Sequence, residues 1–195
     1  MKKPTTMYAP LAVRLYQLYE CPEELRDFEQ WVYAEADELE VQLPEDLFVL
    51  LLSFPYQSKY AHHELFSALG PHMDWGAYER WSLEKQLEHI IELDVLLLDA
   101  LVKMYHLSRN GYTFLSELGM SFGLDVIARY DCDLRVLPKA EGKAAREQFR
   151  QEQGPPAVAE ARQVMQWLET GQIVLTGRRL GRLREREFID RRLKH

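Results

Sequence analysis

Residues 22–39, PEELRDFEQWVYAEADEL, indicate which kind of secondary structure builds this protein. Pro22 followed by two glutamates is typical of a helix N-terminus, because proline fits the first turn and carboxylates interact favourably with the positive end of the helix dipole. Apolar side chains then recur at spacings of three and four, at Leu25, Phe28, Val32, Ala36 and Leu39. This stripe predicts one helix from Pro22 to Leu39 with its apolar side toward the core.

A second stripe on the same helix is acidic and has one aromatic member. It consists of Glu24, Asp27, Trp31, Glu35 and Glu38, and helix geometry places it beside the buried side, where it meets water. One interpretation is that Trp31 covers the edge of the core while the acids only make the surface hydrophilic. The other is a partner-binding surface, because an aromatic anchor surrounded by charge is typical of interface hot spots. We predict these five residues as the partner-binding site.

The rest of the chain predicts further helices and one hairpin. Residues 47–52, LFVLLL, are apolar all round, which predicts a central helix. Residues 77–109 lack glycine and proline and form one long helix or two, and the glycines at 111, 119 and 123 punctuate two short helical pieces. Other predicted helices cover residues 10–20, 59–69 and 157–170, and IVLTG and EFIDRR near the C-terminus predict a β-hairpin.

The predicted fold is therefore mainly α, a compact multi-helix domain with a small C-terminal β-hairpin. We expect a single domain over residues 1–195. Its helical body covers residues 10–130, approximately, and a more polar helix-plus-hairpin portion covers residues 135–195.

Charge is unevenly distributed along the chain, whose net charge is −7. Residues 20–50 hold eleven carboxylates and the single base Arg26, whereas residues 135–195 hold fourteen bases and eight acids. The segment GRRLGRLRER contributes five of these bases, namely Arg178, Arg179, Arg182, Arg184 and Arg186. These arginines are a possible secondary contact: they can bind phosphates, dock on an acidic patch of a partner, or pair with the acidic segment of the same chain. The acidic remainder of the protein argues against nucleic acid as a partner.

No catalytic motif occurs in the sequence, which lacks a phosphate-binding glycine loop, a nucleophile elbow and a zinc-protease motif. The cluster His62-His63-Glu64 does not predict a metal site, because adjacent helical side chains diverge by about 100°. Asp94 interrupts the apolar stripe of residues 77–109, so we predict a buried carboxylate that needs a partner, with Arg14 and His63 as candidates. A catalytic role for Asp94 in a helical pocket is an alternative. We predict no cofactor and no metal.

Composition predicts an ordinary globular protein rather than a disordered or membrane-spanning one. Of the 195 residues, 47% are apolar and 28% charged, and no apolar run approaches the roughly 20 residues that cross a bilayer. No apolar segment follows the N-terminal MKKPTT, and the two cysteines are too few for a disulfide framework. We expect a cytoplasmic protein without a membrane partner.

Three segments resemble small bacterial proteins that act as immunity partners of polymorphic or contact-delivered toxins. They are LYECPEELRDFEQWVYAEADELE, NGYTFLSELGMSFGL and the ending WLETGQIVLTG…EFIDRR, and the resemblance covers about half the chain. The resemblance implies a mostly helical protein that binds and neutralises one cognate toxin and is not an enzyme. It supplies no functional residues to transfer.

The predicted function is stoichiometric binding of a protein toxin through the acidic surface. A toxin that attacks nucleic acid tends to have a basic cleft, which an acidic helix with an aromatic anchor can fill. The alternatives are a nucleic-acid- or phosphate-binding protein that uses the arginine-rich segment and a small enzyme centred on Asp94. The sequence predicts neither the oligomeric state nor the identity of the toxin.

Overall fold

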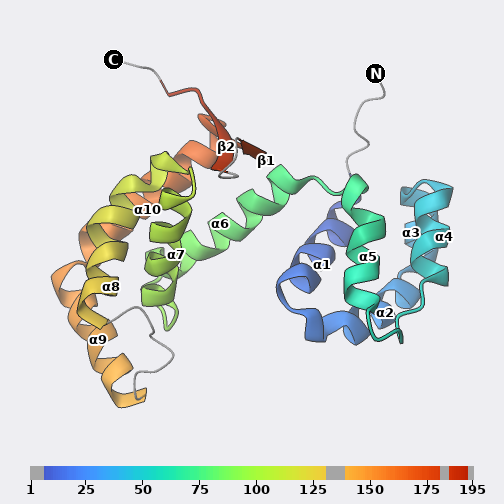
Figure 1. Ribbon diagram of the computed structural model, residues 1–195, viewed down its shortest axis with the longest axis horizontal. Coiled ribbons are helices and arrows are strands. Elements are labelled where there is room, and N and C mark those ends of the chain that lie inside the picture. The colour runs from blue at the N-terminus through green and yellow to red at the C-terminus, as the bar shows by residue number, and fades with distance from the viewer. Residues whose placement is uncertain (1–6, 131–138, 181–184, 193–195) are drawn as a thin grey trace. The chain divides into compact units, whose positions relative to one another are not determined.

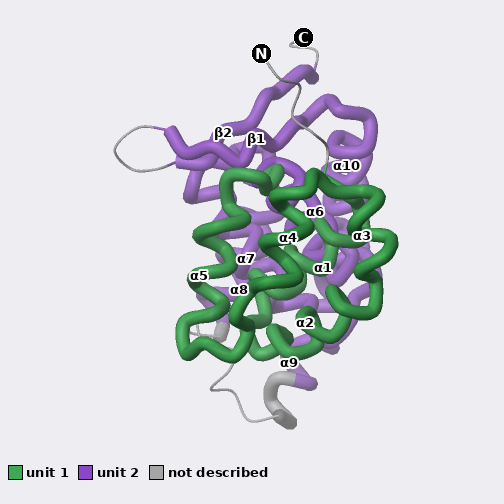
Figure 2. Tube along the Cα trace, turned by 90° about the vertical axis from the view of Figure 1, so that its right-hand side faces the viewer, with its two compact units in different colours: residues 1–74 green, residues 75–195 purple. Residues whose placement is uncertain are grey.

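The computed structural model describes residues 7–130, 139–180 and 185–192, which form α-helices and one β-hairpin (Figure 1). The predicted mainly-α fold with a small C-terminal hairpin is confirmed. The chain divides into two compact units, unit 1 with residues 1–74 and unit 2 with residues 75–195 (Figure 2). The sequence predicted one domain with a change of character near residue 135, whereas the boundary between the units follows Asp74. No helix among the described residues has the length and apolarity that a bilayer crossing requires.

Unit 1 is built from short helices. In chain order they are α1 (Ala9–Glu20), the 3-10 turn η1 (Pro22–Glu24), α2 (Leu25–Ala34), α3 (Ala36–Gln42), α4 (Glu45–Ser53), α5 (Ala61–Leu69) and the 3-10 turn η2 (Gly70–His72). The stripe predicted for residues 22–39 faces the core, with Phe28, Val32 and Leu39 buried. The single predicted helix is wrong, because the chain bends at Glu35 between α2 and α3. The bend keeps Leu39 on the core side while α3 turns toward α4.

The predicted central helix, α4, lies instead at the edge of unit 1. Leu47 and Leu51 are buried, but the side chain of Val49 is 52% exposed. A unit of this size has too small a core to enclose a helix on all sides. The Val49 side chain of α4 therefore remains exposed to solvent.

Unit 2 contains the longer helices and the hairpin. Its elements are α6 (Trp75–Ile91), α7 (Leu97–Arg109), the 3-10 turn η3 (Thr113–Leu115), the π-helix η4 (Glu117–Gly123), α8 (Leu124–Tyr130), α9 (Lys139–Glu152), α10 (Gly154–Glu169), β1 (Ile173–Leu180) and β2 (Glu185–Asp190). Residues 77–109 thus form two helices rather than one. The helix breaks at Leu93, which has a left-handed backbone conformation with a φ of 52°. Just before α7, Asp94 Oδ1 accepts a 2.7 Å hydrogen bond from the Leu96 amide.

The two glycines of the π-helix η4 allow it to pack closely on α7. Gly119 and Gly123 lie in one continuous helical run, so the prediction that they separate two helical pieces is wrong. A Cβ atom on Gly123 would lie 2.3 Å from the Leu101 carbonyl oxygen, and one on Gly119 would lie 2.9 Å from that of Met104. The glycines are therefore contact residues between helices.

The hairpin is antiparallel and packs on α6 and α10. Its register pairs Leu175 with Phe188 and Leu180 with Glu185, and a bulge falls between Leu175 and Arg179. Gly177 in the bulge has a φ of 69°, and a Cβ there would lie 2.5 Å from the Trp75 backbone. The bulge thus brings β1 against the first turn of α6 and carries Arg179 and Arg186 to that helix.

Candidate functional site

The predicted partner-binding residues lie on the surface of unit 1, and we call them the acidic face: Glu24, Asp27, Trp31, Glu35 and Glu38. All four carboxylates are exposed. Within the described residues, the side chains of Glu24, Asp27 and Glu35 form no ion pair or hydrogen bond, and Glu38 accepts one from Gln42 at 2.9 Å. The structure therefore places these carboxylates in water, as predicted, and their role in binding stays a prediction.

Trp31 lies where the acidic face meets the core. Its indole is partly buried, packs against the core of unit 1, and has its ring centroid 6.1 Å from that of Phe28. The Arg14 guanidinium lies over the Trp31 ring, 5.7 Å from its centroid. Trp31 thus covers the core edge, as one interpretation expected, and keeps an accessible part beside the carboxylates. A side chain fixed in this way loses little rotamer freedom when a partner covers it.

The acidic face belongs to a larger acidic surface. The segment from residue 23 to residue 46 contains ten carboxylates and one base, Arg26. Nine of these carboxylates are exposed, namely Glu23, Glu24, Asp27, Glu35, Asp37, Glu38, Glu40, Glu45 and Asp46. Unit 1 as a whole has thirteen acids and five bases, a net charge of −8, whereas unit 2 is nearly neutral at +1. The charge asymmetry of the sequence is therefore an asymmetry between the units.

The predicted secondary contact, the arginine-rich segment, is partly used inside unit 2. Arg179 and Arg186 both pair with Glu79 of α6, while the Arg178 side chain is exposed. Arg182 and Arg184 lie outside the described residues. The alternative that the acidic and basic segments pair with each other stays a prediction.

Glu79 is a buried carboxylate that the sequence analysis did not identify. Its side chain is 5% exposed. Glu79 lies one turn before Leu83 and two turns before Leu87, on the buried side of α6. That register was the available signal, because it continues the apolar stripe of α6 back to Glu79.

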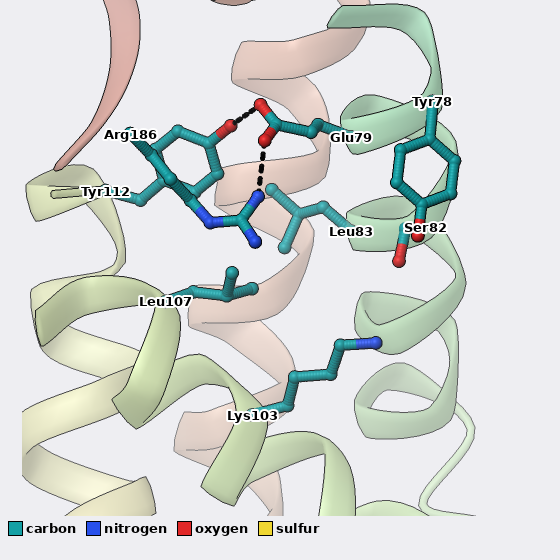
Figure 3. Close-up of a pocket in the computed structure, with 8 residues that line it drawn as sticks. All are labelled: Tyr78, Glu79, Ser82, Leu83, Lys103, Leu107, Tyr112 and Arg186. Carbon is teal, nitrogen blue, oxygen red and sulfur yellow. Dashed lines mark hydrogen bonds and ion pairs between the residues drawn. The ribbon is translucent and has the colours of Figure 1, made fainter. Parts of the chain in front are cut away.

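Three donors surround the Glu79 carboxylate, and Figure 3 shows two of them, Tyr112 and Arg186. The Tyr112 hydroxyl donates to Oε2, Arg186 Nη1 donates to Oε1 at 2.5 Å, and Arg179 Nη2 lies 3.2 Å from the same Oε1. The Arg186 guanidinium also lies 5.5 Å from the centroid of the Tyr112 ring. The cluster joins α6, the start of η3 and both hairpin strands, so it fixes the hairpin on the helices.

Two buried tyrosines have pKa values raised well above the usual range. Burial is the main cause for Tyr112, and the hydrogen bond and charge of Glu79 raise its pKa further, against the opposing effect of Arg186. Burial also raises the pKa of Tyr56 in unit 1, whose hydroxyl donates to the Leu51 carbonyl at 2.9 Å. The folded state therefore favours the protonated form of both hydroxyls.

We expect the free energy of unfolding to fall as the pH rises above about 10, the ordinary tyrosine pKa. Burial makes the tyrosine hydroxyl harder to deprotonate in the folded state than in the unfolded state. The stabilisation that each buried hydroxyl contributes is therefore complete below pH 10 and is lost as the pH rises above it. Each tyrosine contributes a slope of up to about 1.4 kcal/mol per pH unit. Urea unfolding between pH 9 and 11.5 measures this slope. Tyr56→Phe should flatten it, and Tyr60→Phe, at a residue 61% exposed, should not. Equal slopes in both variants would contradict the assignment.

Asp94 is not buried, and the prediction of a carboxylate in the middle of an apolar stripe is wrong. It lies in the turn between α6 and α7 and its side chain is 30% exposed. Its partner is His89, whose Nδ1 lies 2.7 Å from Asp94 Oδ2, rather than Arg14 or His63. The helix break moves Asp94 off the stripe, and its carboxylate accepts a hydrogen bond from the amide of Leu96, just before α7.

A small pocket lies beside Glu79, with a volume of about 90 Å³. It is lined by Tyr78, Glu79, Ser82, Leu83, Lys103, Leu107, Tyr112 and Arg186. Pockets that enclose whole small-molecule ligands are typically about 300–1,000 Å³. Asp94 does not line this pocket. Within the described residues, no three His, Cys, Asp or Glu side chains lie together as metal ligands do.

Comparison with known proteins gave no match to a protein family, to a curated protein or to a solved structure.

Proposed function

We propose that this chain is a stoichiometric protein-binding module that neutralises a cognate bacterial toxin through the acidic face of unit 1. The observation that carries the proposal is the density of exposed carboxylates on residues 23–46, where nine acids face water and Arg26 is the only base. Side chains gathered at this density repel one another, so the surface is more stable when a basic partner covers it. The resemblance to toxin immunity proteins supports the same assignment.

The chemistry of the acidic face favours a partner with a basic cleft. Glu24, Asp27, Glu35 and Glu38 are not engaged by arginine or lysine among the described residues, so they are available to cations of another molecule. Long-range attraction between opposite potentials speeds association, and an aromatic anchor in the centre adds apolar burial. Enzymes that cut nucleic acid have basic clefts shaped for a polyanion, and an acidic protein surface can occupy one.

Two observations favour a protein partner over nucleic acid. The carboxylates of unit 1 repel the phosphates of a nucleic acid, and Glu79 offsets part of the positive charge that Arg179 and Arg186 add to unit 2. The structure describes three arginines of the segment GRRLGRLRER. Of these three, only Arg178 is exposed and forms no ion pair with a described residue.

The test is a charge reversal on the acidic face. The variant Glu24→Lys, Glu35→Lys, Glu38→Lys is purified with a tag from the native cell beside the unchanged protein. We expect the unchanged protein to retain one basic protein that is toxic when expressed alone, and we expect the variant to lose it. Co-expression of the unchanged protein should restore growth, and the variant should not.

The matched control reverses three exposed carboxylates of unit 2, Glu88→Lys, Glu92→Lys and Glu169→Lys. This control variant changes the net charge of the protein by the same amount as the acidic-face variant. It therefore distinguishes an effect of the acidic face from an effect of net charge. Retention of the partner by the acidic-face variant, or loss from both variants, would contradict the proposal.

A further inference from the structure

The pocket between α6 and α7 has an excess of positive charge. Among the described residues that line it, Glu79 is the only carboxylate, and it pairs with Arg186 of the lining and with Arg179, which lies outside the lining. Lys103 adds a further cation to the lining. The three cations therefore exceed the single carboxylate, and the pocket attracts anions.

Lys103 is the cation of the pocket lining that has no counter-ion among the described residues. Its side chain is partly buried, and it forms no ion pair or hydrogen bond with any residue that the structure describes. Figure 3 shows the side chain extending from α7 toward α6, with its nitrogen on the side where Ser82 lies. A partly desolvated ammonium group gains free energy when an anion approaches it, because water no longer fully compensates its charge.

Arg186 supplies donors at the other end of the pocket. One terminal nitrogen of its guanidinium is bound to Glu79, and Figure 3 shows the second one pointing away from that carboxylate, in the direction of Leu107. A guanidinium held in place by one carboxylate presents its remaining N–H groups in a fixed plane, which suits the two oxygens of an oxyanion. Leu83 and Leu107 form the apolar wall between the two cationic ends.

The volume restricts what can enter. A volume of about 90 Å³ is well below the roughly 300–1,000 Å³ of pockets that enclose whole small-molecule ligands, so the pocket suits a small group. We infer that this pocket binds a small oxyanion, a phosphate or carboxylate group, between Lys103 and Arg186. The inference concerns unit 2 alone and does not depend on the toxin partner proposed for unit 1.

The test is a titration of the full-length, ¹⁵N-labelled protein with inorganic phosphate and, separately, with acetate, at constant ionic strength set with sodium chloride. We expect saturable shifts of the amide signals of Ser82, Leu83 and Leu107 with at least one of the two anions. Saturation by phosphate alone assigns a phosphate site, saturation by acetate alone a carboxylate site, and saturation by both a general oxyanion site.

Variants separate the pocket from general salt effects. Lys103→Met should raise the dissociation constant of the binding anion at least tenfold. Lys85→Met removes an exposed lysine of α6 that does not line the pocket, and it should leave the dissociation constant within twofold. The absence of saturable shifts with both anions, or equal affinity in the Lys103→Met variant and the unchanged protein, would overturn the inference.

Discussion

Replacing Gly123 by alanine is expected to lower the free energy of unfolding of unit 2 by about 3 kcal/mol or more. The added methyl group would lie 2.3 Å from the Leu101 carbonyl oxygen and 3.0 Å from the Tyr105 Cβ atom, both of α7. A backbone oxygen cannot turn away as a flexible side chain can. The η4 and α7 backbones would have to separate, which would open the core around Leu118 and Phe122.

Gly154→Ala is the matched control for this substitution. A Cβ on Gly154 at the start of α10 meets only the ends of the Leu93 side chain, at 3.5 Å, which is ordinary contact. We expect its effect on stability to lie within about 1 kcal/mol, because alanine also favours the helix. Chemical denaturation of the two variants measures the difference. Equal stabilities would show that the contact between η4 and α7 is looser than the glycines indicate.

Replacing Glu79 by alanine is expected to destabilise unit 2 by about 3 kcal/mol. The substitution leaves the hydroxyl of the fully buried Tyr112 without its acceptor and leaves two guanidinium groups without their counter-ion. Arg179 and Arg186 are 41% and 24% exposed, so both can turn partly to water, which keeps the loss below that of a fully buried ion pair. The hairpin should detach before the helices unfold.

Glu84→Ala provides the comparison, because Glu84 lies on the same helix and pairs with Arg80 at the surface. An exposed pair one turn apart contributes about 0.3–0.5 kcal/mol. Denaturation gives the two stabilities, and hydrogen exchange of the β1 and β2 amides reports the hairpin separately. If Glu79→Ala cost no more than Glu84→Ala and left hairpin protection unchanged, the cluster would not be what holds the hairpin.

The sequence predicted most elements because their signals are local. The spacing of Phe28, Val32 and Leu39 depends only on helix geometry, and the hairpin follows from two β-type runs with glycine between them. The break inside residues 77–109 has no such signal, because neither glycine nor proline marks it. Leu93 adopts a left-handed conformation, and its carbonyl accepts a hydrogen bond from Arg150, which is 57 residues later. A turn stabilised by so distant a residue is not readable from its own sequence.

For the candidate sites, too, the sequence predicted what depends on local spacing and missed what depends on distant contacts. The exposure of Glu24, Asp27, Glu35 and Glu38 was predictable, because a helix with one apolar stripe leaves the flanking stripe in water. The role of Glu79 was not, because its partners Tyr112 and Arg186 are 33 and 107 residues away. The hydrogen bonds and ion pairs of Glu79 come from residues far away in the sequence, so its role follows from the tertiary structure.

The most direct test of the proposed function is the dissociation constant between this protein and the basic protein it retains, measured at low and at moderate salt. We expect the charge reversal at Glu24, Glu35 and Glu38 to weaken binding by at least a hundredfold at low salt, mainly through slower association. Trp31→Ala should instead speed dissociation. Binding that is as tight in the triple variant as in the unchanged protein, with the same salt dependence, would contradict the account.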